Sequence, residues 1–264
     1  MEPRGSAVVT GGAGGIGRAV AEHLVRHGYH VVVADVDGDA ARRTAEEIGA
    51  AAGVCQDVRE EDSHRVVAEE ALKHAPLAVW VNNAGVGNDG ALGDLPSAAV
   101  EQLVQVNLMG VLWGMRAALA AFGPAGGDVV NIASMSAHGP VPGLSTYAAT
   151  KAAVVSLSSS VSVETPKNVR VHALCPDGVD TPLVEAMSDH GRAKALVHSG
   201  GALLTPEEVA VAAVGLIGSS RIVLSLPTWR SVLMRFTSVT PSVSMRGERL
   251  FLWAGRRRMR GTRS

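Results

Sequence analysis

The chain has 264 residues, of which 47% are hydrophobic and 19% charged, and its formal net charge is -1. This length suits one α/β domain with a sizeable core. The nearly balanced charge argues against a nucleic-acid-binding protein. We therefore expect a single domain over residues 1–264 that binds small molecules and copies of itself, and no nucleic acid.

The N-terminal sequence and the cysteines both bear on the compartment in which the protein is expected. Cys55 and Cys175 are the two cysteines, each beside an apolar run, so we expect two buried, reduced thiols and neither a disulfide scaffold nor a metal site. The first apolar run begins within six residues, without a signal peptide's pattern, and no uncharged run has membrane-spanning length. These features predict a cytoplasmic protein, for which membrane contact is not expected.

Short apolar runs rich in β-branched residues alternate with longer segments of helical period. Strands are expected at 7–10, 31–35, 52–58, 78–82, 128–133, 169–175 and 221–226. Helices are expected at 15–27, 39–48, 60–74, 97–122, 146–164 and 206–218. This rhythm predicts an α/β fold, a doubly wound seven-stranded parallel sheet whose ligand lies at the carboxyl ends of the strands.

Two segments interrupt the alternation. Residues 177–204 mix apolar and charged residues without a strand, so we expect a helical substrate lid there. Residues 227–264 hold several large apolar residues with Pro241 and Gly247, which predicts an apolar C-terminal extension packed on the body. The last nine residues, 256–264, contain five arginines and no acid. A solvated tail is the simplest interpretation of that composition, and contact with an anionic membrane is the lesser alternative.

A glycine-rich segment, Thr10-Gly-Gly-Ala-Gly-Gly-Ile-Gly17, lies between the first strand and the first helix. Glycine permits sharp turns and close approach of the backbone to a pyrophosphate, and the amides of a helix N-terminus favour an anion. Asp35 ends the second strand, where a carboxylate can accept hydrogen bonds from both ribose hydroxyls and repel a 2'-phosphate. The predicted cofactor is therefore NAD, with Asp57 and Val58 beside its adenine.

Tyr147 and Lys151 are four residues apart in an expected helix, and Ser134 lies 13 residues before the tyrosine. Residues at i and i+4 share one helix face, so the ammonium lies beside the phenol and should lower its pKa from about 10. A serine hydroxyl can hydrogen-bond the same substrate oxygen. This set suits hydride transfer to or from a carbonyl.

Taken together, these motifs resemble the short-chain dehydrogenase/reductase family over residues 1–226, with a Rossmann fold. They are T-G-x-x-x-G-x-G at 10–17, Asn-Asn-Ala-Gly at 82–85, Asn107, Ser134 and Tyr-Ala-Ala-Thr-Lys at 147–151. The resemblance implies four catalytic residues: Tyr147 as general acid/base, Ser134 orienting the substrate, Lys151 holding the nicotinamide ribose, and Asn107 positioning a water.

The resemblance also implies which residues contact each ligand. The expected cofactor-binding residues are Gly11, Gly15, Ile16, Gly17, Asp35, Asp57, Val58, Asn83, Ala84, Gly85, Tyr147, Lys151, Pro176, Val179 and Thr181. The expected substrate-binding residues are Ser134, Met135, Tyr147 and Leu183.

The chain departs from the family at two places. Asp177 replaces a usual glycine, and if it points toward the nicotinamide its charge would favour the oxidised cofactor, although an outward loop position is simpler. The family's usual ending after the last strand is replaced by Pro227-Thr228-Trp229. The resemblance therefore implies a homodimer or homotetramer, with a dimer through the helices at 97–122 and 146–164 favoured.

The segments expected to line the pocket are mostly apolar, and His138 near them is expected at the surface. We therefore expect a hydrophobic secondary alcohol or ketone as substrate, oxidised with NAD. Two alternatives stay open. One is a biosynthetic ketoreductase that works in the reductive direction, and the other, from a different class, is a nucleotide-sensing binding protein without turnover.

Overall fold

The computed structural model describes residues 4–188, 191–239 and 251–259, and its sheet holds seven parallel strands in the order β3-β2-β1-β4-β5-β6-β7. The strands are β1 (Ser6–Thr10), β2 (His30–Asp35), β3 (Ala52–Cys55), β4 (Leu77–Asn82), β5 (Gly127–Ile132), β6 (Val169–Pro176) and β7 (Val223–Leu226). The order reverses direction between β1 and β4, which confirms the predicted doubly wound sheet.

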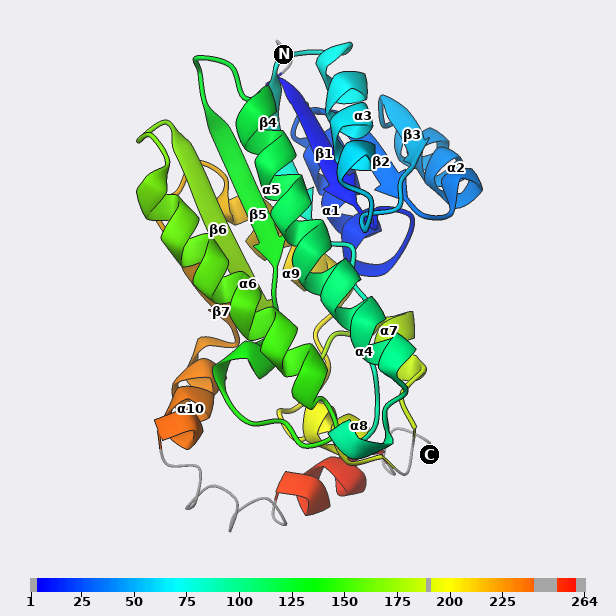
Figure 1. The fold of residues 1–264 in the computed structure, drawn as a ribbon, viewed down its shortest axis with the longest axis vertical. Helices are drawn as coiled ribbons and strands as arrows, with labels where there is room; N and C mark the ends of the chain where they lie inside the picture. Colours follow the sequence, from blue (N-terminus) through cyan, green and yellow to red (C-terminus); the bar gives the residue numbers. More distant parts are fainter. Residues whose placement is uncertain (1–3, 189–190, 240–250, 260–264) are drawn as a thin grey trace.

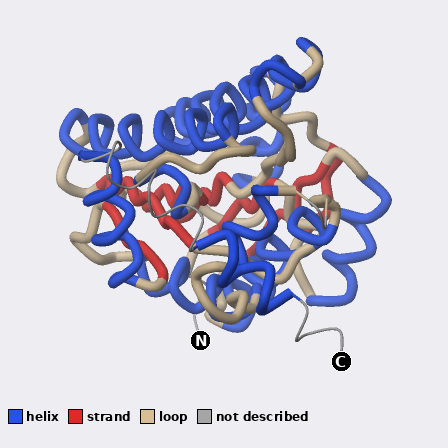
Figure 2. The backbone as a smooth tube through the Cα atoms, turned by 90° about the horizontal axis from the view of Figure 1, so that it is seen from below, coloured by secondary structure: helices blue, strands red, loops and turns tan. Residues whose placement is uncertain are grey.

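Helices cover both faces of this sheet, and Figure 2 shows it as a middle layer between two helical layers. One layer holds α1 (Gly15–Arg26), α2 (Gly38–Ile48) and α9 (Pro206–Leu216). The other holds α3 (Glu61–Leu72), α4 (Ser97–Val104), α5 (Gly110–Ala121) and α6 (Ser145–Glu164). Each layer buries its own hydrophobic cluster against the sheet.

The strand sequences explain why both faces are covered. In β1, Ala7 and Val9 belong to the cluster with α1, α2 and α9, whereas Val8 belongs to the cluster with α3, α5 and α6. All three side chains are fully buried. Because successive strand residues point to opposite faces, a parallel strand covered on both sides needs an apolar residue at nearly every position.

The third strand differs from its prediction at the carboxyl end. It ends at Cys55 and not at Val58, because the Asp57 carboxylate accepts a hydrogen bond from the backbone N–H of Arg59 (3.0 Å) and turns the chain. Cys55 is exposed on this edge strand, so the prediction of two buried thiols is wrong for Cys55. Cys175, on β6 inside the sheet, is buried as predicted.

The predicted helix at 97–122 is one continuous helix over Ser97–Ala121 with a π-helical turn, η2 (Gln105–Met109), between α4 and α5. Its length of 25 residues and its hydropathy of 1.3 would suffice to cross a membrane. Its α5 part buries Val111, Met115 and Ala118 in the cluster against the sheet. Packing in the core therefore accounts for part of its apolar composition.

The remaining helices lie at the carboxyl end of the sheet, at the bottom of Figure 1. The segment 177–204 contains the helices α7 (Pro182–Glu185) and α8 (Arg192–His198), in agreement with the expected helical segment. An isolated bridge pairs Val179 with Leu204, near its two ends. The C-terminal extension forms α10 (Thr228–Val239) and a helix over residues 251–259. Pro241 and Gly247 lie outside the described residues.

Candidate active site

A single cavity of about 1090 Å³ opens at the carboxyl ends of the strands, and it brings most predicted site residues together. Its wall includes the predicted residues Gly11, Gly15, Ile16, Asp35, Asp57, Val58, Asn83, Ala84, Gly85, Ser134, Met135, Tyr147, Lys151, Pro176, Val179, Thr181 and Leu183. Gly17 and Asn107 do not reach this wall. Residues from the glycine-rich turn and from the lid therefore share one space.

The N-terminus of α1 faces this cavity without a side-chain cap. Its N-cap, Gly14, supplies no side-chain hydrogen bond, and the first turn of α1 contains no acid. In α2, by contrast, the Asp37 carboxylate accepts hydrogen bonds from the backbone N–H groups of Asp39 and Ala40. The first amides of α1, including those of Gly15 and Ile16 in the cavity wall, are therefore available to an anion such as a pyrophosphate.

Two glycines in this turn are required by close packing. A Cβ at Gly11, which has a positive φ of 61°, would lie 2.7 Å from the Cα of Ala84. A Cβ at Gly17 would lie 2.1 Å from the carbonyl oxygen of Gly11. Gly17 thus supports the turn from behind, and its predicted contact with the cofactor remains a prediction.

Asp35 lies at the end of β2, as predicted, and lines the cavity. Its carboxylate accepts hydrogen bonds from the backbone N–H groups of Ala13 (3.1 Å) and Asp37 (3.2 Å), which fix its position beside the glycine-rich turn. Gln56 lines the same part of the cavity and is 2% exposed, yet its amide has no hydrogen-bond partner among the described residues. A buried amide without a partner suits a ligand-binding position, and no sequence signal identified Gln56.

These observations test whether a nicotinamide dinucleotide fits. One cavity wall holds four features: the uncapped N-terminus of α1, the glycines that leave room for a ligand, the Asp35 carboxylate and the unpaired Gln56 amide. Each group matches a part of such a molecule: phosphate, ribose hydroxyl or base. The residues present therefore fit the cofactor.

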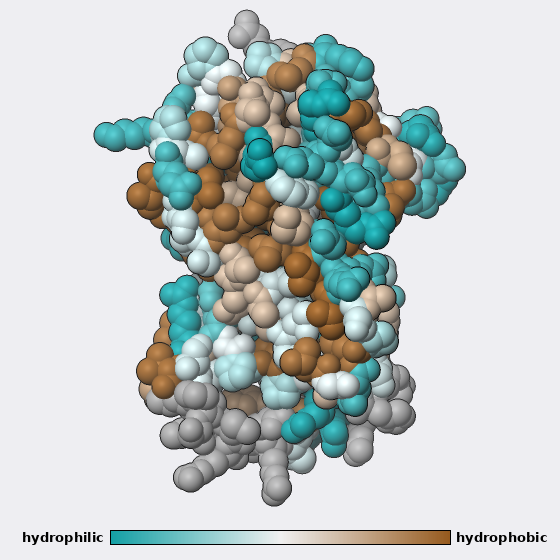
Figure 3. All heavy atoms as spheres, in the orientation of Figure 1, coloured by the Kyte–Doolittle hydropathy of each residue, from teal (hydrophilic) through white to brown (hydrophobic). Residues whose placement is uncertain are grey.

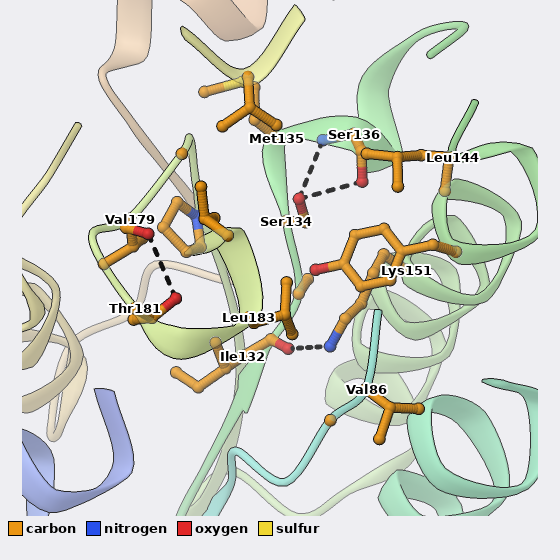
Figure 4. Close-up of a pocket in the computed structure, with 18 of the residues that line it drawn as sticks. Val86, Ile132, Ser134, Met135, Ser136, Leu144, Lys151, Val179, Thr181 and Leu183 are labelled. Atoms are coloured by element: carbon orange, nitrogen blue, oxygen red, sulfur yellow. Dashed lines mark hydrogen bonds between the residues drawn. The ribbon is translucent and has the colours of Figure 1, made fainter. Parts of the chain in front are cut away.

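Ser134 follows β5 and forms the N-cap of a short 3-10 helix, η3 (Met135–His138). Its Oγ accepts hydrogen bonds from the backbone N–H of Ser136 (3.2 Å) and from the Ser136 hydroxyl (3.0 Å), as Figure 4 shows. Burial raises the pKa of the nearby Tyr147 phenol, and the Ser134 side chain acts in the opposite direction. Ser134 and Tyr147 both line the cavity.

Lys151 lies one turn after Tyr147 on α6 and is 4% exposed. Its Nζ donates a hydrogen bond to the carbonyl oxygen of Ile132 (2.9 Å), drawn in Figure 4, and lies 5.7 Å from the centroid of the Tyr147 ring. Burial lowers the pKa of Lys151 to about 8. The ammonium therefore remains mostly charged at neutral pH, beside the phenol, as predicted from the spacing.

The predicted effect of Lys151 on the phenol is not borne out in the protein alone. Burial raises the pKa of Tyr147 above its ordinary value, and the neighbouring Ser134 side chain opposes this shift without cancelling it. Desolvation by the surrounding protein disfavours the charged phenolate, and this effect is the largest one on Tyr147. Tyr147 is accordingly a neutral phenol here, and a proton donor.

Asn107 lies in the π-helical turn and is fully buried. Its Oδ1 accepts a hydrogen bond from the backbone N–H of Val86, and its Nδ2 donates to the Val86 carbonyl, both at 2.8 Å. A Cβ on Gly85 would lie 3.3 Å from Asn107 Oδ1 and 3.5 Å from Lys151 Nζ, so the asparagine and the lysine meet around this glycine. Asn107 thus fixes the strand end next to Lys151, and its predicted contact with a water remains a prediction.

Asp177 lines the cavity but does not present a lone charge to it. Its carboxylate pairs with the guanidinium of Arg230 on α10, with Nε at 3.0 Å from Oδ2. The Arg230 Nη2 also donates to the carbonyl oxygen of Leu196 and to the hydroxyl of Ser199, both at 3.1 Å. The two alternatives for Asp177, toward the nicotinamide or out to solvent, are both replaced by an ion pair that joins the lid to α10.

The substrate end of the cavity is apolar and includes residues that the sequence reasoning did not assign to it. Met135, Leu183 and Met187 were expected in this wall, and Leu196 and Val197 in the lid that covers it. The wall also includes five residues of the C-terminal extension, Trp229, Leu233, Met234, Thr237 and Phe251. Their signal lay in the helical spacing of Trp229, Leu233 and Thr237, which are four residues apart on α10. The C-terminal extension is therefore part of the cavity wall.

The same helix also supports the loop that carries Ser134. The Ser238 hydroxyl donates to the carbonyl oxygen of His138 (2.7 Å), and a Cβ on Gly139 would lie 2.8 Å from the Met234 carbonyl oxygen. His138 is 7% exposed and its Nε2 lies 3.0 Å from the Ser225 hydroxyl, so the prediction that it lies at the surface is wrong. Contact with α10, distant in sequence, buries it.

Comparison with known proteins agrees with this geometry. The sequence profile of the short chain dehydrogenases matches residues 6–191. A probable oxidoreductase, EphD of Mycobacterium tuberculosis, is 35% identical over 194 residues, which cover 69% of this chain but only 32% of that longer protein. The sorbitol dehydrogenase of Cereibacter sphaeroides is 37% identical (66% of this chain, 70% of the relative). The 3-beta-hydroxysteroid dehydrogenase of Comamonas testosteroni is 32% identical (77% and 85%).

Solved structures share the fold. A 3-ketoacyl-(acyl-carrier-protein) reductase from Brucella melitensis, complexed with NADH, superposes with a TM-score of 0.78 at 30% identity, covering 87% of this chain and 99% of the other. An actinorhodin polyketide ketoreductase with NADPH superposes with a TM-score of 0.74 at 27% identity, covering 84% and 95%. Both neighbours bind a nicotinamide cofactor, one without and one with the 2'-phosphate.

Proposed function

Because this chain belongs to the short chain dehydrogenase family, we propose that it transfers a hydride between NAD and a hydrophobic secondary alcohol or ketone. The observation that carries this proposal is the meeting of Ser134, Tyr147 and Lys151 in one cavity, between a phosphate-binding turn and an apolar wall. A bound nicotinamide dinucleotide supplies the hydride acceptor or donor.

The chain's own residues handle the substrate oxygen and its proton. The Tyr147 hydroxyl gives a proton to a ketone oxygen or takes one from an alcohol, and the Ser134 hydroxyl hydrogen-bonds the same oxygen and fixes its direction. Lys151, held at the Ile132 carbonyl, keeps a positive charge beside the phenol and is within reach of a ribose hydroxyl. The positive charge favours the phenolate whenever Tyr147 acts as the base.

A Tyr147→Phe variant tests this proposal against the nucleotide-sensing alternative. The test screens secondary alcohols and ketones with the unchanged protein by following the absorbance of the reduced cofactor. The fastest reaction is then repeated with the variant. Loss of turnover by at least 100-fold with cofactor affinity kept within a few-fold is expected. A protein that binds the cofactor but turns over no alcohol or ketone would support the sensor instead.

The reductive direction is a second candidate, and one observation favours it. Burial raises the pKa of Tyr147, so its phenol is protonated at neutral pH and ready to donate to a ketone. Arg230 also neutralises the charge of Asp177, which removes that reason to favour the oxidised cofactor. The ratio of kcat/KM for ketone reduction to that for alcohol oxidation at pH 7 distinguishes the two directions.

The preference for NAD is inferred from Asp35. Its carboxylate is fixed by two backbone amides at the end of β2, where an adenosine ribose would lie. A negative charge there accepts hydrogen bonds from the ribose hydroxyls and repels a 2'-phosphate. The neighbouring Arg59 guanidinium is engaged by Asp57 (2.9 and 3.0 Å), which leaves it poorly placed to attract that phosphate.

The hydrophobic substrate class is inferred from the cavity wall and not from the relatives, whose names include both a polyol and a steroid. Leu144, Met187 and Ala193 form a small buried cluster beside the site, with Leu183 and Val197 packed on it. A wall of this composition binds apolar rings or chains and discriminates against charge. A charged or sugar-like alcohol turned over faster than any apolar one would argue against this class.

The proposed assembly is a homodimer through α4, α5 and α6. Hydrophobic side chains gather over α5 and α6 in Figure 3, whereas hydrophilic ones gather over α2 and α3, and Val163 on α6 is 81% exposed. Such a face is typical of association between copies. A Val163→Asp variant should weaken this assembly, which sedimentation velocity measures, and a purely monomeric parent protein would contradict it.

A further inference from the structure

The charges of this chain are unevenly distributed along its length. Residues 227–264 contain nine arginines and one glutamate, so this extension carries a charge of +8 and the rest of the chain carries -9. The described part of the extension, α10 and the helix over 251–259, contains arginines and no acidic residue. A basic segment on an acidic body attracts an anionic partner to one end of the molecule.

The same segment exposes large apolar side chains. On α10, Trp229, Val232, Phe236 and Val239 are between 60% and 81% exposed, and Trp229, Val232 and Phe236 follow the i, i+3, i+7 spacing of one helix face. Figure 3 shows hydrophobic side chains over α10 at the lower left of the molecule. Trp253, on the second helix, is 58% exposed. An apolar face of this size on a protein surface indicates an interaction site.

Arginine and tryptophan also meet directly. The Arg257 guanidinium lies over the Trp253 ring at 5.4 Å from its centroid. Arg258 is tied instead to the carbonyl oxygen of His198 (3.2 Å), which anchors this helix to α8. Gly255 packs so closely on Ala195 that a Cβ would lie 1.8 Å from its carbonyl oxygen. The helix is thus attached through one side and presents Trp253, Arg256 and Arg257 on the other.

We propose that α10 and the helix over 251–259 dock this protein on an anionic lipid surface. Amphipathic helices with aromatic and aliphatic residues on one face and arginines beside them lie in the interface of such membranes. Each arginine near the headgroups contributes attraction to anionic lipids, while tryptophan occupies the boundary between headgroups and acyl chains. The sequence-based expectation favoured a solvated tail at 256–264 and gave contact with an anionic membrane only as the lesser alternative; the proposal here rests on the two helices.

Continuity with the cavity favours lipid over nucleic acid or an acidic protein. Trp229 belongs both to the exposed face of α10 and to the cavity wall. Leu233, one turn later, is 38% exposed and also lines the cavity. The aliphatic Val232 and Val239 beside them offer nothing to stack on a base or to pair with a carboxylate. The docking itself does not depend on the proposed reaction.

Vesicle binding by the full chain tests this proposal. Phosphatidylcholine vesicles with 30% phosphatidylglycerol, compared with pure phosphatidylcholine, should bind the protein at least tenfold more tightly in a sedimentation assay, and less so in high salt. The double variant Arg256→Glu/Arg257→Glu should lose more than tenfold of this affinity, and Val232→Glu about tenfold. Neither variant changes a residue of the cavity wall.

Val211→Glu is the matched control, because Val211 is 56% exposed and lies on α9, which packs on α1 and β6. It should bind vesicles like the parent protein, and all variants should share its thermal unfolding midpoint. Equal binding to neutral and anionic vesicles, an unaffected Val232→Glu variant, or tighter binding to a single-stranded oligonucleotide than to vesicles would each overturn the proposal.

Discussion

The two ends of the cavity are built in different ways. The cofactor end is shaped by backbone and short polar groups at the carboxyl ends of β1, β2 and β4, inside the seven-stranded core. The substrate end is shaped by apolar side chains from α7, α8 and α10, which lie outside the sheet and are joined through the ion pair of Asp177 and Arg230. The first end holds one constant molecule, whereas the second can change its specificity without disturbing the core.

Substitution in the glycine-rich turn should have the largest effect. A methyl group at Gly17 would meet the Gly11 carbonyl oxygen, and backbone there has no room to move. We expect Gly17→Ala to weaken NAD binding at least 100-fold, measured by calorimetry. Gly215→Ala is the matched control: Gly215 has open space around it in α9 and should become about 0.5–1 kcal/mol more stable, with unchanged NAD affinity. Equal NAD affinity in both variants would show that the cofactor end is more adaptable than its packing suggests.

Lys151 lies where the two ends of the cavity meet. Its buried ammonium should lower the free energy of unfolding even though turnover requires it. Because burial lowers its pKa from 10.5 to about 8, the unfolded chain binds an extra proton between these values, and the free energy of unfolding rises with pH there. Below pH 8 the buried ammonium costs about 3 kcal/mol. We expect Lys151→Met to abolish turnover yet to stabilise the cofactor-free protein at pH 7 by about 1–2 kcal/mol, after loss of the Ile132 hydrogen bond.

Urea unfolding at pH 7 and pH 9.5 checks this expectation. The advantage of the variant should shrink by about 2 kcal/mol at the higher pH, because the folded parent protein has by then lost the proton. A variant that is less stable than the parent at both pH values would mean that the Lys151 ammonium is not destabilising.

Asp35 should show a smaller but more selective effect. Asp35→Ala removes a fixed carboxylate, so NAD affinity should fall on the order of tenfold while the ratio of NADP to NAD affinity rises. Asp35→Asn keeps a side-chain oxygen for the Ala13 amide, so it should lose less NAD affinity than Asp35→Ala. Its ratio of NADP to NAD affinity should rise by a similar factor, because the negative charge is gone. Fluorescence titration with both cofactors measures this, and an unchanged ratio in Asp35→Ala would refute the ribose assignment.

Substitution of Arg230, at the substrate end, should have the smallest effect and should change KM more than kcat. Arg230→Gln breaks the ion pair with Asp177 and loosens the lid, so KM for the best substrate should rise about fivefold with kcat within twofold, since no reacting group moves. Arg235→Gln, at an exposed position on the same helix, should leave KM unchanged. A large fall in kcat for Arg230→Gln would instead tie this end of the cavity to the chemical step.

The sequence predicted the sheet, the helices and most of the cofactor end because these depend on local periodicity and on closely spaced motifs. It misplaced features that depend on contacts between distant segments. Asp177 meets Arg230, and His138 is buried beneath α10. Tyr147 differs for another reason: its spacing from Lys151 was evident, but the extent of its burial was not.

The neighbours of β1 bear on how the chain folds. Val8 pairs with Val32 on one side and with Trp80 on the other, so one contact joins residues 24 positions apart and the other joins residues 72 apart. The entropy of loop closure makes the longer pairing the slower one. During synthesis the β1–α1–β2 crossover unit can assemble well before β4 leaves the ribosome, and the crevice for the nucleotide is completed only when that later strand arrives.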